Sequence, residues 1–280
     1  MAVRCYLFVP GDKPAMVAKA PRRGAGAVIV DLEDAVAPAV RPAAIGSVAE
    51  WIAGLDDPGC EVWVRIPGDD PAGELAALVT PGLRGVVLPK ARRAAHVERV
   101  AALLGETERT CGAAAGSMGL IVIVETAAAV VDVEAIAAVP RVERLMSGEI
   151  DLSAELGIAA GEQAAWTAIR SRIVIAGAAS GLAGPIGPVN PDFSDPEALA
   201  AEARLLRRHG FRAGAAIHPV QIAPYLEAYT PNREEIAAAR RVVALYEAAV
   251  GEGRGVVVDD RGRMVDEAAV KIARRLLDEA

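Results

Sequence analysis

The chain alternates between short apolar runs and longer segments in which apolar residues recur at helical spacing. Valine and isoleucine concentrate in the short runs, which predicts buried parallel strands, and the alanine-rich segments between them predict helices packed on those strands. The clearest helical segments are Pro38–Gly54, Ala94–Leu104 and Ala164–Ala179. The strand candidates are Cys5–Val9, Ala27–Leu32, Glu61–Arg65, Gly85–Leu88, Gly119–Val124, Arg144–Met146, a weaker one at Leu182–Ile186, and Ala213–Ile217.

These eight strand–helix units recur at intervals of roughly 20 to 40 residues, which is typical of a (β/α)₈ barrel. An open, doubly wound sheet would use the same alternation. The first strand, however, is not followed by the Gly-x-Gly-x-x-Gly turn that such a sheet uses to bind a dinucleotide. The pattern therefore favours an α/β fold of the TIM-barrel type, with a catalytic barrel domain over residues 1–229.

The pattern changes in residues 230–280. Glu234–Val250 predicts a long amphipathic helix, Val256–Val265 predicts a hairpin, and Asp266–Leu277 predicts a last helix capped by Asp266. This segment is too short to bury a core of its own. We expect a C-terminal helix–hairpin–helix extension that packs on the barrel or on a neighbouring subunit.

Composition excludes several classes of protein. Apolar residues make up 53% of the chain, which argues against disorder, and the net charge of −7 argues against a general nucleic-acid binder. Cys5, Cys60 and Cys111 show no Cys-x-x-Cys spacing, and an odd number of cysteines fits reduced thiols. The sequence starts with strand-like residues and contains no apolar run long enough to span a bilayer. We expect a cytoplasmic protein without nucleic-acid or membrane partners.

Charged side chains follow five of the predicted strands, at the end of a barrel where active sites lie. Asp31–Asp34 supplies three carboxylates, Arg65 ends the third strand, and Lys90 follows the fourth. Glu125 follows an apolar run, where a carboxylate is costly unless a cation meets it. Asp151 follows the next strand. Each charge alone is more often structural, but charges after five strands at one barrel mouth indicate a functional site.

Two features suggest specific chemistry. Glu125 and Asp151 are carboxylates on adjacent units, and Mg²⁺ prefers a few such ligands completed by water and substrate. Arg65 carries a planar guanidinium that suits a substrate carboxylate, and Lys90 adds a cation at the same level. The sequence therefore predicts a Mg²⁺ site beside a cationic carboxylate-binding group.

In order along the chain, these segments resemble the citrate lyase β-subunit-like family, within the HpcH/HpaI aldolases and related to malyl-CoA and citramalyl-CoA lyases. The resemblance covers nearly the whole chain, and the ordered set is more specific than any one motif. The matching segments are Arg4–Gly11, Asp31–Val36, Val64-Arg65, Leu88–Lys90, Glu125–Ala127, Gly148-x-x-Asp151, Arg170–Val174, Asp195-Pro-Glu, Ile217-His-Pro-x-Gln221 and Gly262–Asp266.

The resemblance implies a Mg²⁺-dependent carbon–carbon lyase acting on a citryl-, malyl- or citramalyl-type thioester, with roles at matching positions. Metal ligands would be Glu125 and Asp151; substrate would contact Arg65, Glu125, Lys90 and Gly148. The catalytic residues would be Arg65, Glu33, Asp34 and Asp266, and the loop receiving the coenzyme A or carrier arm would use Arg4, Pro10, Gly11 and Lys13. That loop opens a helix whose N-terminus would favour phosphate.

The resemblance also implies a homo-oligomer, a trimer or hexamer, in which Asp266 reaches a neighbour's active site. Capping of the last helix explains Asp266 equally well from the sequence alone. The chain departs from the family pattern at Pro67, Ile150, Gly187 and Gly214, which leaves the substrate open. Two alternatives also remain open: a thioester hydrolase or free oxo-acid aldolase using the same site, and a non-catalytic ligand-binding paralogue.

Overall fold

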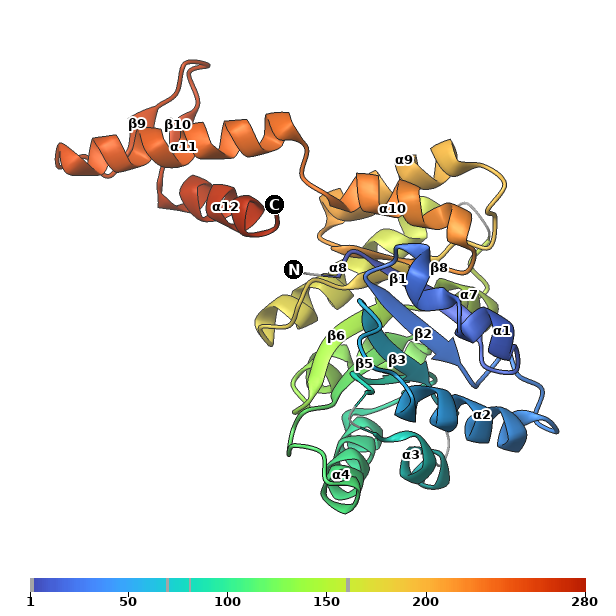
Figure 1. Ribbon diagram of the computed structural model, residues 1–280. Helices are drawn as coiled ribbons and strands as arrows, with labels where there is room; N and C mark the ends of the chain where they lie inside the picture. The colour runs from blue at the N-terminus through green and yellow to red at the C-terminus, as the bar shows by residue number, and fades with distance from the viewer. Residues whose placement is uncertain (1–2, 69–70, 81, 160–161) are drawn as a thin grey trace. The chain divides into compact units, whose positions relative to one another are not determined.

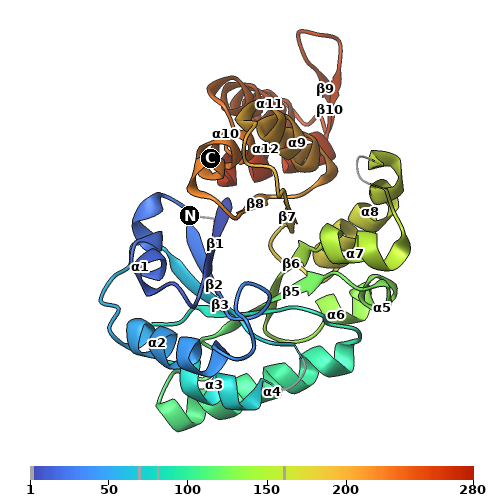
Figure 2. The same cartoon turned by 90° about the vertical axis from the view of Figure 1, so that its right-hand side faces the viewer.

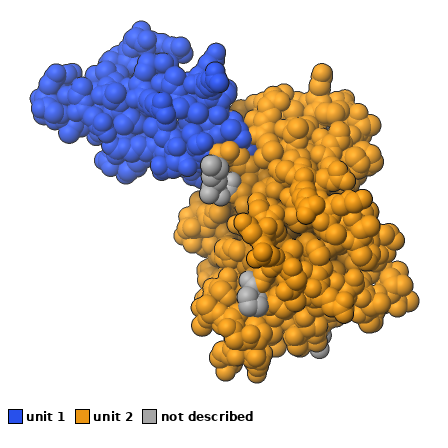
Figure 3. Space-filling model, viewed as in Figure 1, with its two compact units in different colours: residues 1–2, 228–280 blue, residues 3–227 orange. Residues whose placement is uncertain are grey.

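The chain folds into a closed eight-stranded parallel barrel followed by a smaller C-terminal unit, as a computed structural model describes for residues 3–68, 71–80, 82–159 and 162–280. The first compact unit is Val3–Glu227, and residues 228–280 form the second; Figure 3 colours the two. The expected barrel fold is confirmed.

The strands follow one another around the barrel in sequence order, and β1 closes it by pairing in parallel with β8. The interior is filled by apolar residues such as Ile29, Trp63, Ile121 and Met146, which alternate with outward-facing positions. The strands are β1 Cys5–Pro10, β2 Ala27–Asp31, β3 Glu61–Arg65, β4 Gly85–Leu88, β5 Gly119–Val124, β6 Val142–Ser147, β7 Ile186–Val189 and β8 Ala213–Ala216.

Helices lie around the outside of this barrel, as Figures 1 and 2 show. The alanine-rich stretches form them as expected, and α4 runs further than expected, until Gly112 adopts a left-handed φ of 75°. The helices of this part are α1 Pro14–Val17, α2 Arg41–Ala53, α3 Ala72–Leu78, α4 Ala94–Cys111, α5 Ala127–Val131, α6 Val133–Ala137, α7 Glu149–Leu156, α8 Gln163–Ala179, α9 Pro196–His209 and α10 Ile222–Tyr229, with 3₁₀ turns at Ala20–Arg23 and Pro219–Gln221.

The seventh strand lies later in the chain than the sequence pattern indicated. The expected strand Leu182–Ile186 is wrong except at its last residue, because β7 begins at Ile186. The N–H of Leu182 still donates to the carbonyl of Gly177, 2.9 Å away, and so belongs to the end of α8. Gly181, with a φ of 69°, makes this turn possible.

The C-terminal unit has the expected helix–hairpin–helix order: α11 Arg233–Gly251, β9 Val257–Val258, β10 Met264–Val265 and α12 Glu267–Asp278. Asp266 is the N-cap of α12, and its Oδ1 accepts a hydrogen bond from the Ala269 N–H at 2.9 Å. An ion pair of 3.0 Å between Arg274 and Glu247 joins α12 to α11. Whether this unit packs on a neighbouring subunit stays a prediction.

Two observations bear on the chemical class of the chain. Cys5, Cys60 and Cys111 are all free, and burial raises the pKa of the Cys5 thiol to about 12, so this thiol is not a reactive nucleophile. Among the residues described, every helix is too short or too polar to cross a membrane.

Candidate active site at the mouth of the barrel

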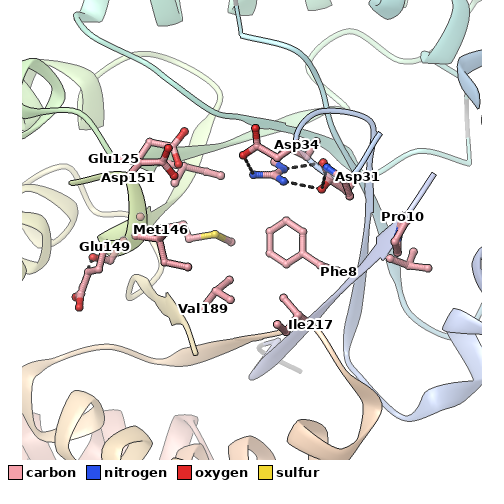
Figure 4. Close-up of a pocket in the computed structure, with 17 residues that line it drawn as sticks. Phe8, Pro10, Asp31, Asp34, Glu125, Met146, Glu149, Asp151, Val189 and Ile217 are labelled. Carbon is pink, nitrogen blue, oxygen red and sulfur yellow. Dashed lines mark hydrogen bonds and ion pairs between the residues drawn. The ribbon is translucent and has the colours of Figure 1, made fainter. Parts of the chain in front are cut away.

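A cavity of about 300 Å³ lies at the carboxyl ends of the barrel strands. Carboxylates and one guanidinium occupy part of its wall, and apolar side chains occupy the rest. Figure 4 shows Glu125 and Asp151 at one end of this cavity and Asp31 and Asp34 at another. The lining residues used below are Phe8, Pro10, Asp31, Asp34, Arg65, Ile123, Glu125, Met146, Gly148, Glu149, Ile150, Asp151, Val189 and Ile217.

Arg65 is the cation in this wall, and Asp31 is its principal partner. The two residues face each other in register at the ends of β3 and β2. The Asp31 carboxylate accepts from Arg65 Nε at 2.7 Å and from Nη2 at 2.5 Å, a bidentate pair. The guanidinium also lies 5.4 Å from the centre of the Phe8 ring. Arg65 is therefore fixed on one side, while its Nη1 group is less tightly held.

Glu33 and Asp34 complete this network and connect it to Lys90. Arg65 Nη1 lies 3.1 Å from Glu33 and 3.5 Å from Asp34. The Lys90 ammonium forms ion pairs with Glu33 and with Asp34, the latter at 3.1 Å. Burial alone would lower the pKa of Lys90, but these two carboxylates outweigh it and raise that pKa. Lys90 thus lies beside the cavity and holds its carboxylates, whereas Arg65 faces into it.

The backbone of Lys90 contributes as well. Its φ of 52° is unusual for a residue with a side chain, and this conformation directs the Lys90 N–H to Glu125 Oε1 at 2.6 Å. Glu125 is 4% exposed. Burial raises the pKa of Glu125 to about 7; the Lys90 N–H opposes this rise, and the negative charge of Asp151 adds to it. A buried carboxylate and an exposed one that repel each other across the same cavity are a place where a cation is stabilised.

The residues present fit a Mg²⁺ ion. No group of three or more His, Cys, Asp or Glu side chains with metal-binding geometry occurs among the described residues, but Mg²⁺ needs only one or two carboxylates plus oxygens from water and substrate. Glu125 supplies a buried carboxylate, and Asp151 lies in the first turn of α7. A Cβ at Gly148 would lie 2.3 Å from Glu125 Cβ and 2.9 Å from its Oε2, so the space beside this carboxylate depends on glycine.

A second buried ion pair joins Arg170 to Glu149, two residues before Asp151. Arg170 of α8 is 1% exposed, and it donates to both carboxylate oxygens of Glu149 at 2.7 Å. It also donates to Gln163 Oε1 at 2.7 Å. Because Glu149 is the first residue of α7, the pair fixes the turn that carries Asp151.

The residues expected to receive a coenzyme A arm are not all brought together. Pro10 ends β1 and lines the cavity, and the Gly11 N–H donates to the carbonyl of Asp31 at 2.8 Å. Lys13 is exposed and pairs with Asp12 at 3.0 Å. Arg4 precedes β1 and so lies a strand's length from the mouth. The helix opened by this loop, α1, has four residues, too few for the expected phosphate-favouring dipole.

Asp266, the last expected catalytic residue, lies in the C-terminal unit, where its carboxylate caps α12. Its role in catalysis therefore stays a prediction, as do the roles of the other site residues. The geometry brings Arg65, Glu33, Asp34, Lys90, Glu125, Gly148 and Asp151 together in or beside one cavity.

Sequence reasoning placed Asp31 at the barrel mouth but gave it no role, and it gave none to Glu149. Asp31 was visible as the last residue of an apolar strand, in the position opposite Arg65 in a parallel sheet. Glu149 had no local signal, because its partner Arg170 lies 21 residues away. The unusual Gly214 also has a structural reason: a Cβ there would lie 2.2 Å from Cδ1 of Tyr225, whose buried ring fills the space.

Comparisons with known proteins agree with this geometry. A family model described as HpcH/HpaI aldolase/citrate lyase matches residues 4–219. An L-malyl-CoA/β-methylmalyl-CoA lyase of Cereibacter sphaeroides is 33% identical, covering 99% of this chain and 94% of the relative. The citrate lyase subunit β of Leuconostoc mesenteroides is 31% identical, covering 98% and 92%. The crystal structure of CitE from Mycobacterium tuberculosis, in complex with magnesium, acetoacetate and coenzyme A, is 35% identical, with a TM-score of 0.81 and coverage of 100% and 98%.

Proposed function

The chain belongs to the HpcH/HpaI aldolase/citrate lyase family, and from this premise we propose that it is a Mg²⁺-dependent carbon–carbon lyase acting on a 3-hydroxyacyl coenzyme A thioester. The products would be a 2-oxo acid and a shorter acyl thioester. The relatives from C. sphaeroides and L. mesenteroides are a malyl-CoA lyase and a citrate lyase subunit, and this chain is a lyase of the same family. The bound magnesium, acetoacetate and coenzyme A in the M. tuberculosis relative support the choice of metal and thioester.

The observation that carries the proposal is the shared cavity of Arg65, Glu125 and Asp151. Cleavage beside a carboxylate needs a fixed positive charge for that carboxylate and a metal for the oxygen that becomes a carbonyl. Arg65 would supply the first, because it lines the cavity and Asp31 holds one edge of its guanidinium, whereas Nη1 has longer contacts to Glu33 and Asp34. Glu125 and Asp151 would hold the metal ion.

The reaction can be assigned to groups of the protein. When bound by Glu125 and Asp151, Mg²⁺ would supply Lewis-acid polarisation of the substrate's carboxylate and hydroxyl oxygens. Arg65 would orient that carboxylate and stabilise charge that develops beside it. A base takes the hydroxyl proton, the oxygen becomes the carbonyl of the 2-oxo acid, and the electron pair of the broken bond moves to the thioester's α-carbon. That carbon then takes up a proton.

Asp266 from a neighbouring copy is our candidate for the group that exchanges these protons. The proposal requires an oligomer, either a trimer or a hexamer, in which the C-terminal unit of one subunit reaches the cavity of another. It rests on the match of Gly262–Asp266 to the family motif and on the acidic side chain at the start of α12.

A panel of malyl-, citramalyl- and citryl-coenzyme A tests the proposed function. We expect release of a 2-oxo acid in the presence of Mg²⁺ and its loss in EDTA. Release of free coenzyme A without a 2-oxo acid would instead identify a thioester hydrolase. Release of neither product from any thioester would contradict both activities.

The metal site has its own test. Calorimetry should detect one Mg²⁺ per chain in the wild type and none in Glu125→Gln. The matched control is Glu98→Gln, which changes an exposed glutamate of α4 and should bind Mg²⁺ normally. Equal binding by wild type and Glu125→Gln would remove Glu125 from the site.

A further inference from the structure

We propose that the 2-oxo acid half of the substrate carries a single carboxylate and an apolar substituent, so that the site discriminates against a dicarboxylic 2-oxo acid. The inference rests on the proposed lyase function and names the substrate class of that site. Two observations carry it: the balance of charge around the cavity and the placement of its apolar wall.

Negative charge exceeds positive charge around the cavity. Three cations contact the cavity's carboxylates among the described residues: Arg65, Lys90 and Arg170. Together with the two charges of a bound Mg²⁺, these side chains give five positive charges, against six negative charges on the carboxylates in or directly beside the cavity. The carboxylates in or directly beside the cavity are Asp31, Glu33, Asp34, Glu125, Glu149 and Asp151.

Most of this positive charge is already engaged. Lys90 is committed to Glu33 and Asp34, and the fully buried Arg170 is committed to Glu149. Arg65 is the one cation of the three that lines the cavity, and its Nη1 contacts, 3.1 Å to Glu33 and 3.5 Å to Asp34, are longer than its bonds to Asp31, so one substrate carboxylate can pair with it there. A second substrate carboxylate would therefore enter a site without a cation to meet it, where neighbouring carboxylates repel it.

The rest of the wall is apolar. In Figure 4, Phe8, Met146, Val189 and Ile217 gather together, apart from the row formed by Glu125, Asp34 and Asp31. Ile123 and Ile150 line the same cavity. A carboxylate placed against these side chains would lose water without gaining a hydrogen-bond donor, whereas a methyl or larger alkyl group would be stabilised there.

The neighbouring cations do not change this balance. Lys19 and Arg23 line a separate cavity that shares Phe8, Val9 and Ile217 with the first. Phe8 and Ile217 belong to the apolar wall, and neither Lys19 nor Arg23 is among the residues that line the first cavity. A cation placed on the wall at Ile217, by contrast, would face the substrate directly.

The experiment compares two acids of similar size and different charge. Oxaloacetate and 4-methyl-2-oxopentanoate differ in that a carboxylate of the first is an isopropyl group in the second. Freshly prepared acids are titrated by calorimetry into the protein saturated with Mg²⁺. We expect 4-methyl-2-oxopentanoate to bind at least about tenfold more tightly, the scale on which apolar pockets discriminate. Ile217→Arg should reverse or abolish the difference.

The control is Ile175→Arg, which places the same cation on an exposed residue of α8 outside the cavity lining. It should leave the preference of the wild type unchanged. Tighter or equal binding of oxaloacetate by the wild type would overturn the inference and leave the lyase function standing. If Ile175→Arg shifts the preference as much as Ile217→Arg, the apolar wall is not its cause. Binding of neither acid, together with no 2-oxo acid release from the thioester panel, would overturn the proposed function as well.

Discussion

Replacing Asp31 by asparagine should weaken the hydrogen bonds that hold the Arg65 guanidinium against the end of β2. The Asp31 carboxylate accepts four hydrogen bonds: from Arg65 Nε and Nη2, from the Glu33 N–H at 2.9 Å and from the Ala35 N–H at 3.2 Å. It therefore fixes both the guanidinium and the loop that carries Glu33 and Asp34. An asparagine has the same shape, but one of its two acceptor oxygens becomes an NH₂ group.

The magnitude follows from these contacts. If the amide oxygen takes the position of Oδ1, the NH₂ group faces Arg65 Nη2 and the Ala35 N–H, which are both donors. Two hydrogen bonds are lost; the one from the Arg65 guanidinium alone costs about 1.5–3 kcal/mol, and the buried guanidinium also loses its nearest counter-charge. Glu33 at 3.1 Å limits this second cost. We expect Asp31→Asn to lower the free energy of unfolding by about 3 kcal/mol.

Urea denaturation followed by circular dichroism measures this change, and Asp34→Asn is the matched control. Asp34 is in the same loop, but its side chain is 52% exposed and lies 3.5 Å from Arg65, so its loss should cost less than about 1 kcal/mol. A positioning role also predicts a fall in kcat/KM of about 100-fold in Asp31→Asn at temperatures where the protein is folded. Equal stabilities of the two variants, or normal turnover in folded Asp31→Asn, would refute the reasoning.

Three further outcomes are expected. Arg65→Lys keeps the charge but loses the planar fork, so steady-state kcat/KM should fall by an amount equivalent to about 2–3 kcal/mol; near-native kinetics would remove Arg65 from substrate binding. The hydrogen-bonded Arg141 lowers the pKa of Glu108 to about 2, so its stabilisation is present above the unfolded value near 4.5 and is lost as pH falls toward 2. Glu108→Gln should cost about 2 kcal/mol at pH 7, after allowance for screening, and less at pH 3; an equal loss in urea denaturation at both would exclude this linkage. Asp266→Asn should preserve stability, because asparagine caps as well as aspartate, yet abolish most turnover. Mixing it with Arg65→Ala after proven subunit exchange should restore some activity, and a monomer in sedimentation or no rescue would count against a shared site.

Much of the fold was predictable because its determinants are local. The apolar runs that form β3, β4 and β5 were located to the residue, since each is bounded by polar or turn-forming residues. Asp266 was identified as a cap from its own position before a helical pattern. The strand β7 was misplaced because Leu182, although apolar, is held by a hydrogen bond that closes α8.

The sequence by itself determined which charged residues reach the mouth of the barrel, because the end of an apolar strand fixes that position for Arg65 and Glu125 alike. Only the tertiary structure decided how those charges pair. Strand register places Asp31 opposite Arg65, and the pairing of β2 and β4 with the two sides of β3 brings Lys90 to Glu33 across 57 residues of chain. Such pairs depend on register, rotamer and burial, which residues distant in sequence set jointly. Hydrophobic periodicity therefore predicts the strands of the barrel, whereas the partners of Arg65 follow from the register between neighbouring strands.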